Sequence, residues 1–216
     1  MRTLILARHG HAVSNEHGGT ASCTVPGQGL TESGKAQARR LGDALATEPI
    51  DLGVATELCR TEETIELALE GRGIPTILVP ELNEIDFGRF DGRPLDEYRG
   101  WAFTAPPDEP APGGGESRAG AADRIASGLR HLLERDEEVI LLVGHALVLR
   151  YILDAAHGIP PAARMTPLEH AVAQLLTREE VQAAAELLEA WSRAPRFRDP
   201  SIEGWAAADT GRPSRT

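Results

Sequence analysis

The sequence predicts an α/β fold: a three-layer sandwich with a mostly parallel central sheet, helices on both faces and a lid-like insertion. The first observation is that short apolar segments of strand length alternate with longer segments in which apolar residues recur at helical spacing. The second is that the clearest strand segments, TLILA (3–7) and VILLV (139–143), are almost continuously apolar. Such segments are typical of parallel strands that helices cover on both faces.

Three strands and two helices are predicted in the first half of the chain. TLILA (3–7) reads as a buried strand, and Thr31 is a good N-cap for a helix over 31–46. LGVA (52–55) is a shorter strand. A helix over 61–69 follows and is closed by the glycines of EGRG. PTILV (75–79) gives the third strand.

The second half repeats the alternation. A helix is predicted over 117–135, and the strand VILLV (139–143) follows it. A further helix is expected over 147–156. Residues 171–176 and 179–193 are expected to form a last strand and a last helix.

Two segments depart from this pattern, and they set the domain prediction. Residues 85–116 lack clean periodicity and end in the Pro/Gly-rich APPDEPAPGGGE, so we interpret them as an insertion, the lid, in a single domain over 1–194. Residues 195–216 are polar and are interpreted as a C-terminal tail. We expect the aromatic residues of the lid to form its own small core, with direct contact with a substrate as the alternative. They are Phe87, Phe90, Tyr98, Trp101 and Phe103.

Composition narrows the classes of function. The chain has 216 residues, is 41% hydrophobic and carries a formal net charge of -11. That charge argues against a nucleic acid or an anionic membrane as partner, because both require a basic surface. Cys23 and Cys59 are too few for a disulfide scaffold, which favours a reducing compartment. We recognise no secretory signal and no membrane-spanning segment, so we expect a cytoplasmic protein.

Polar residues gather where the predicted strands end. Arg8 and His9 follow the first strand, and His145 follows VILLV. Arg60 lies just beyond the second strand and Glu84 just beyond the third. Ligands of open parallel sheets bind at the carboxyl ends of the strands, where loops converge. The sequence therefore predicts one site that contains two arginines, two histidines and a glutamate.

This set of side chains suits phosphoryl transfer without a metal or cofactor. Two guanidinium groups can clamp the oxygens of a phosphate. A neutral imidazole can attack phosphorus and form a covalent intermediate. A carboxyl group can protonate the leaving oxygen and then deprotonate water.

The motifs resemble those of the histidine phosphatase superfamily, also called phosphoglycerate mutase-like. They occur in family order and cover residues 3 to about 150. The matching segments are LARHGHAVSN (6–15), LTESGKAQA (30–38), TELCRTEETI (56–65), ELNEIDFGRFDG (81–92), GGES (114–117) and LVGHALVLR (142–150).

The resemblance implies a role for each central residue. His9 would be the nucleophile that becomes phosphohistidine. Arg8, Arg60 and His145 would form the phosphate pocket, and Glu84 would be the proton donor. The attack requires a neutral His9, with an ordinary pKa of about 6.5, and a protonated Glu84, with an ordinary pKa of about 4.3. We therefore expect desolvation by the lid to raise the pKa of Glu84, with a mildly acidic to neutral optimum.

The resemblance also implies peripheral contacts. Asn15 would contact the phosphate or the nearby loop, and the backbone N–H of Ala146, at the start of a helix, would donate to the phosphate. Cys23 and Thr24 would lie on a substrate loop. Ala146 and Thr24 stand where other members have glycine. Glu63 replaces a common glutamine, and its carboxylate would weaken phosphate binding unless it faces away.

The phosphatase branch is favoured over the mutases. The stretch from Glu84 to His145 is short and has the compact GGES form of family phosphatases. We therefore expect hydrolysis of a small phosphorylated metabolite, with mutase-type phosphoryl transfer as the alternative. The sequence does not identify the substrate. Surface solvation is expected for most of the arginines that could bind a second anionic group: Arg89, Arg93, Arg99 and Arg118.

Two hypotheses from other classes remain. The pair His9 and His11 could be an HxH metal motif with His145 as a further ligand, but Arg8 would repel a dication. A catalytically silent phosphate-binding module would be expected to lose the nucleophile or its partners, which are present here. The sequence does not decide the oligomeric state, and a homodimer is carried forward as a hypothesis.

Overall fold

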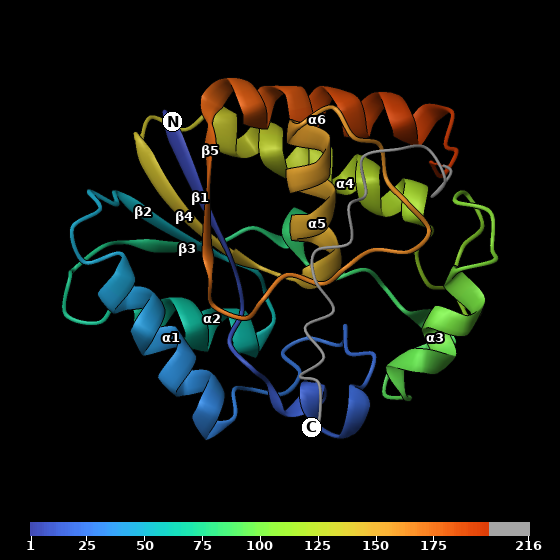
Figure 1. Cartoon of the computed structure of the whole chain (residues 1–216), viewed down its shortest axis with the longest axis horizontal. Coiled ribbons are helices and arrows are strands. Elements are labelled where there is room, and N and C mark those ends of the chain that lie inside the picture. The colour runs from blue at the N-terminus through green and yellow to red at the C-terminus, as the bar shows by residue number, and fades with distance from the viewer. Residues whose placement is uncertain (199–216) are drawn as a thin grey trace, which may run out of the picture.

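A computed structural model of the chain describes residues 1–198 and shows a five-stranded sheet in the order β3-β2-β4-β1-β5 (Figure 1). The first four strands in this order run parallel, and β5 is antiparallel to β1. This confirms the predicted α/β class with a mostly parallel sheet. The strands are β1 (Thr3–Arg8), β2 (Leu52–Ala55), β3 (Thr76–Leu78), β4 (Val139–Gly144) and β5 (Ala173–Thr177).

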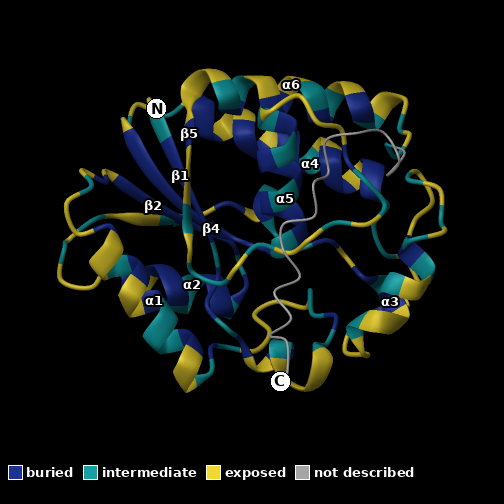
Figure 2. Ribbon diagram, in the orientation of Figure 1, coloured by how far each residue is buried: buried dark blue, intermediate teal, exposed yellow. Residues whose placement is uncertain are grey.

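Helices cover both faces of the sheet, as predicted (Figures 1 and 2). α1 (Glu32–Ala44) and α2 (Cys59–Ala68) lie on one face. The other face carries α4 (Arg118–Leu133), α5 (Ala146–Ala156) and α6 (Arg178–Arg193). Within residues 1–198, no helix combines the length and the apolar character that crossing a membrane requires.

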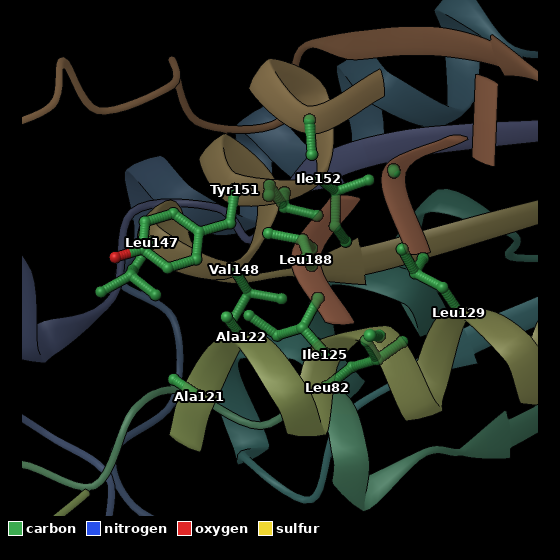
Figure 3. Packing of buried hydrophobic residues seen from close by; sticks show 14 of the residues in the cluster. Leu82, Ala121, Ala122, Ile125, Leu129, Leu147, Val148, Tyr151, Ile152 and Leu188 are labelled. Atoms are coloured by element: carbon green, nitrogen blue, oxygen red, sulfur yellow. The ribbon is translucent and has the colours of Figure 1, made fainter. Parts of the chain in front are cut away.

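Strand β1 divides its side chains between two cores. Leu4 and Leu6 are fully buried against the α4–α6 side, whereas Ile5 and Ala7 are buried against α1 and α2. Figure 3 shows the interlocking apolar side chains of the α4–α6 side. Each large side chain buried in this way contributes about 1.5–3 kcal/mol. The strand that leads to His9 is therefore fixed from both faces.

The start of α2 differs from the prediction. The apolar pattern suggested a helix from Thr61, but α2 begins at Cys59 and places Arg60 in its first turn. The Thr61 hydroxyl donates to the carbonyl of Leu58 at 2.8 Å and so fastens this turn. A polar first turn has no apolar periodicity, which is why the pattern missed it.

The lid contains a helix that the sequence analysis did not predict, α3 (Leu95–Ala102). It is too short to show a clear apolar period. Phe87, Phe90 and Tyr98 are buried in the same core cluster as α4 and α5. These rings also contact one another and the ring of Trp101, with centroids 4.7–5.8 Å apart. The expected aromatic cluster of the lid is therefore present, and it is continuous with the core under α4 and α5.

The beginning of the predicted tail packs against the domain. The ring of Phe197 lies 5.9 Å from that of Trp191, and the backbone N–H of Arg198 donates to the carbonyl of Pro161 at 3.2 Å. Most of the predicted tail, residues 199–216, lies outside the described residues.

The segment after β1 crosses α1 at two glycines. A Cβ atom on Gly34 would lie 2.0 Å from the carbonyl oxygen of His11, and one on Gly10 would lie 2.5 Å from the carbonyl oxygen of Gly34. The backbone N–H of Gly10 also donates to the Thr64 hydroxyl at 3.0 Å. This close contact explains the glycine that follows His9.

Replacing Gly34 with alanine should destabilise the protein by about 1–3 kcal/mol, because the added methyl group meets backbone that cannot move freely. The measurement is urea unfolding. Gly100→Ala is the matched control, because Gly100 is an exposed helical glycine with no atom within 4 Å of an added Cβ. It should be neutral or stabilising by up to about 1 kcal/mol. Equal stability of Gly34→Ala and the wild type would contradict the close contact.

Candidate active site

His9 lies directly after β1 and is only 3% exposed. Its Nδ1 is 2.7 Å from the carbonyl oxygen of Gly10, and the Nε–H of Arg60 donates to its Nε2 at 3.2 Å. A carbonyl can only accept a hydrogen bond and a guanidinium can only donate one. The contacts therefore assign the proton to Nδ1 and the lone pair to Nε2.

Arg60 also joins the second histidine to the first. Its Nη2 donates to the carbonyl of Ser22 at 2.9 Å and to Nδ1 of His145 at 3.2 Å. The Nε2 of His145, 2.9 Å from the Thr56 hydroxyl, then carries the proton. The rings of His9 and His145 lie 5.5 Å apart. The predicted convergence of these strand and helix ends is thus present in the structure.

Two buried guanidinium donors beside His9 have no hydrogen-bond partner among residues 1–198. They are Nε of Arg8 and Nη1 of Arg60. Arg8 is held by a different nitrogen, its Nη1, which donates to the carbonyl of Leu168 at 2.9 Å. Unpartnered buried donors are unfavourable. A bound oxyanion such as phosphate is the kind of acceptor that these donors lack.

The site is positively charged although its histidines are neutral. Burial, and then the charge of Arg60, hold the pKa of His9 and of His145 well below the ordinary value. Burial lowers the pKa of Arg8 to about 10, so its guanidinium remains charged at neutral pH. The positive charge therefore comes from the arginines and the lone pair from an imidazole.

Glu84 follows the 3-10 turn Pro80–Leu82 and is half-buried. Its Oε1 accepts a hydrogen bond from the backbone N–H of Ile85 at 3.0 Å. Burial raises the pKa of this carboxyl, and the charge of Arg60 opposes the rise. The direction agrees with the sequence expectation of a carboxyl that begins the reaction protonated.

The two other predicted phosphate contacts lie at the edge of this cluster. The Oδ1 of Asn15 accepts a hydrogen bond from the backbone N–H of Ala12 at 2.9 Å, which fixes the loop after His9. Ala146 is the first residue of α5 and lines a small cavity together with Glu84. Contact of Asn15 or Ala146 with a phosphate stays a prediction.

Cys23 and Thr24 line a larger cavity of about 600 Å³, which also includes Glu84. Asp91 holds both residues. Its carboxylate accepts a hydrogen bond from the hydroxyl of Thr24 and another, at 2.8 Å, from the backbone N–H of Cys23. Burial raises the pKa of the Cys23 thiol to about 12, so it stays protonated. The Thr24 hydroxyl is therefore engaged by a carboxylate.

Glu63 faces away from the phosphate pocket. Its Oε2 accepts the backbone N–H of Leu30 at 2.7 Å, and its Oε1 accepts from the thiol of Cys59 at 3.2 Å. The HxH hypothesis concerned His11, whose Nδ1 lies 3.2 Å from the hydroxyl of Thr31. Across the described residues 1–198, no group of three or more His, Cys, Asp or Glu is arranged to hold a metal ion.

The sequence analysis missed His170, a third histidine beside the first. Its Nδ1 donates to the backbone carbonyl of His9 at 2.7 Å, and the next N–H, that of Ala171, donates to the carbonyl of Arg8 at 2.8 Å. Burial lowers the pKa of His170 to about 4. Because β5 runs antiparallel to β1, the residues just before β5 lie next to the end of β1. A sequence prediction that β5 is antiparallel would therefore have placed His170 beside His9.

Fold and site together define a class: α/β proteins in which unpartnered guanidinium donors and a neutral histidine lie at the carboxyl edge of the sheet. The family model of the histidine phosphatase superfamily (branch 1) matches residues 4–190. The chain belongs to this superfamily, and it is a histidine phosphatase.

Relatives with two different names match to the same degree. The adenosylcobalamin/alpha-ribazole phosphatase of Salmonella typhimurium strain LT2 is 31% identical over 169 residues, which are 74% of this chain and 82% of the relative. A 2,3-bisphosphoglycerate-dependent phosphoglycerate mutase of Brucella melitensis biotype 2 is 31% identical over 175 residues, 74% of this chain and 84% of that protein. The crystal structure of the alpha-ribazole phosphatase from Shigella flexneri matches the structure of this chain with a TM-score of 0.70 at 26% sequence identity. The match covers 80% of this chain and 89% of the Shigella protein.

The buried histidines should make stability depend on pH. An unfolded histidine takes up a proton near pH 6.5, whereas His170 in the folded protein resists protonation down to about pH 4. Between these values the unfolded state binds more protons, so this residue's contribution to the free energy of unfolding falls as the pH falls. The variant His170→Asn keeps a neutral hydrogen-bond donor at this position. Its free energy of unfolding should change less between pH 6.5 and pH 4 than that of the wild type.

The measurement is urea unfolding across this pH range. His131→Asn, at an exposed histidine of α4, is the control and should keep the wild-type dependence. Identical pH dependence in His170→Asn and the wild type would contradict the neutral state assigned to His170.

Proposed function

We propose that the protein hydrolyses a small phosphomonoester, without a metal, through a phosphohistidine formed at Nε2 of His9. The observation that carries the proposal is the state of His9. Its Nδ1 is held by the Gly10 carbonyl, its Nε2 bears the lone pair, and two unpartnered guanidinium donors lie beside it.

Substrate binding begins with an exchange of hydrogen bonds. The lone pair of His9 accepts from Arg60 at 3.2 Å, a longer than usual separation. A phosphate oxygen is a stronger acceptor for this donor. When the phosphate docks between Arg8 and Arg60, the guanidinium turns to the oxygens and releases Nε2 to face phosphorus.

The first chemical step forms the bond between Nε2 of His9 and phosphorus while the bond from phosphorus to the leaving oxygen breaks. Glu84 transfers its proton to that oxygen. The ring of His9 becomes more acidic as it loses its lone pair, and the hydrogen bond from its Nδ1–H to Gly10 stabilises the developing charge. Arg8 and Arg60 stabilise the charge on the transferred phosphoryl group.

The second step returns the enzyme to its starting state. Glu84, now ionised, removes a proton from a water molecule that attacks phosphorus. The bond from phosphorus to Nε2 breaks, inorganic phosphate leaves, and His9 is neutral again. The pKa directions fit both steps: His9 favours its neutral form and Glu84 favours its protonated form.

A small substrate is proposed because the nucleophile is buried. His9 is 3% exposed and His145 is fully buried, so a folded protein substrate would not reach them. The net charge of -11 supports a metabolite over a nucleic acid or an anionic membrane. We also propose that the protein works in the cytoplasm.

Mutase-type phosphoryl transfer is the second candidate, because relatives named phosphatase and mutase are equally similar. It differs from hydrolysis only in the acceptor. Release of inorganic phosphate in one-to-one proportion to alcohol supports hydrolysis, and transfer of the phosphoryl group to a second alcohol supports the mutase.

His9→Ala should abolish phosphate release from a generic aryl phosphate, whereas EDTA should leave the wild-type rate unchanged. The loss should be at least about 10³-fold, because the variant removes the nucleophile. His131→Ala, at an exposed histidine, is the matched control and should keep the wild-type rate. A wild-type rate abolished by EDTA would overturn the metal-free proposal.

Glu84→Gln should slow the release of a poor leaving group far more than that of a good one. An alkyl alcohol needs the proton of Glu84, and its loss should reduce kcat by about 10²–10⁴-fold. An activated aryl phosphate needs that proton much less. Equal losses on both substrates would contradict the role of Glu84 as general acid.

A further inference from the structure

The peptide group between His9 and Gly10 lies just past the end of the β1 ladder. The last parallel pair of β1 and β4 joins Arg8 to Gly144, and the backbone N–H of His9 still donates to the carbonyl of Gly144 at 3.0 Å. The carbonyl of His9 comes next and accepts its hydrogen bond from a side chain, the ring of His170, at 2.7 Å. Side chains therefore hold the peptide group that follows the nucleophile.

Two side chains hold this peptide group, one at each end. The Nδ1–H of His170 donates to its oxygen, and its nitrogen, the N–H of Gly10, donates to the hydroxyl of Thr64 at 3.0 Å. Thr64 in turn donates to the carbonyl of Arg60 at 2.6 Å. Because a peptide group is planar, contacts at its oxygen and its nitrogen fix the orientation of the whole plane.

The orientation of this plane reaches the nucleophile through the next carbonyl. The Nδ1–H of His9 donates to the carbonyl of Gly10 at 2.7 Å. A tilt of the peptide group before Gly10 would move that carbonyl, since a glycine restricts its neighbouring peptide groups very little. The ring of His9 would then turn and carry Nε2 out of line with phosphorus. One peptide group thus connects His170 to the nucleophile.

The same segment, residues 168–171, holds Arg8 by groups other than the ring of His170. The carbonyl of Leu168 accepts a hydrogen bond from Nη1 of Arg8 at 2.9 Å, and the backbone N–H of Ala171 donates to the carbonyl of Arg8 at 2.8 Å. Different groups of one segment therefore position the phosphate-binding arginine and the nucleophile. Removal of the His170 ring should disturb the second and spare the first.

The backbone of this segment is strained next to His170. Ala171 has a φ of 53°, in the left-handed region that is unfavourable for a residue with a Cβ atom. Strain of this kind persists where surrounding contacts enforce it, and it is concentrated at functional sites. Here the strained turn lets two successive residues, His170 and Ala171, donate to two successive carbonyls, those of His9 and Arg8.

A second histidine makes the same kind of hydrogen bond far from the site. The Nδ1–H of His157 donates to the carbonyl of Leu153 at 2.7 Å, at the C-terminal end of α5. His145 precedes the other end of this helix, and 11 residues of α-helix span about 16 Å. His157 is therefore a matched reference for a bond that only supports the fold.

We infer that His170 is a positioning residue for the reaction: it fixes the peptide group between His9 and Gly10 and so holds the ring of His9 in the orientation from which Nε2 attacks phosphorus. The part that concerns attack rests on the proposed function. Control of the His9 ring is a property of the free protein and does not depend on turnover.

Proton NMR of the free protein tests this control without a substrate. The Nδ1 proton of His9 should give a downfield resonance that exchanges slowly with water and is absent from His9→Ala. His170→Leu removes the donor and should speed this exchange at least about tenfold, as expected for the loss of one hydrogen bond. His170→Asn keeps an N–H donor at the place of Nδ1 and should stay close to the wild-type rate.

Kinetics on the aryl phosphate tests the effect on attack. His170→Leu should lower kcat by about 10–10²-fold, as expected for a misplaced nucleophile. Its Kd for inorganic phosphate, measured by calorimetry, should stay near the wild-type value because Leu168 and Ala171 still hold Arg8. His170→Asn should recover most of kcat. A residue that only supports the fold would not separate kcat from phosphate binding in this way.

His157→Leu is the matched control, because it removes the equivalent hydrogen bond at the far end of α5. It should keep the wild-type exchange rate and kcat. Thermal melting verifies that each variant is folded, and His170→Phe, which keeps a ring without a donor, carries the test if His170→Leu does not fold. Unchanged exchange, unchanged kcat, or equal losses of kcat in the Asn and Leu variants would overturn the inference.

The two proposals fail in different ways. Faster exchange in His170→Leu, together with a wild type that releases no phosphate, would uphold the link from His170 to the His9 ring and contradict the proposed hydrolysis. Wild-type turnover, together with an exchange rate that His170→Leu leaves unchanged, would uphold the hydrolysis and contradict the role of His170.

Discussion

The active site depends on the burial of the Arg60 guanidinium between two histidines. Its Nε–H meets His9 and its Nη2 meets His145, so both rings present a lone pair to it. Burial, and then the charge of this cation, keep the two imidazoles neutral. The same charge opposes the effect of burial on Glu84. The proposed binding of phosphate would give the unpartnered donors of Arg8 and Arg60 matched hydrogen bonds.

The fold supplies the rigidity that this arrangement requires. Parallel β1 and β4 end side by side, which places His9 next to His145. The backbone after β1 is then held from three directions: by the close approach of Gly34, by the hydroxyl of Thr64 and by the ring of His170. Positioning of this quality is what a nucleophilic imidazole needs for in-line attack.

The sequence predicted what depends on local pattern and failed where tertiary packing decides. The buried strands predicted the α/β class, and their ends predicted that His9 and His145 would meet. The tautomer of His9 could not be predicted, because it follows from contacts with Gly10 and Arg60. His170 was missed because only the folded chain shows that an irregular segment returns to β1. The sequence also could not indicate which of the four arginines raised as anion binders is buried, and in the structure it is Arg118 of α4.

The most direct test of the central claim is the chemical identity of the trapped intermediate. The enzyme is mixed with an aryl phosphate, quenched in alkaline denaturant and examined by peptide mass spectrometry and by phosphorus–proton NMR. The account predicts one phosphoryl group on His9, bonded to Nε2, because Nδ1 is occupied by its hydrogen bond to Gly10. Phosphorylation at Nδ1 of His9, or on another residue, would contradict it.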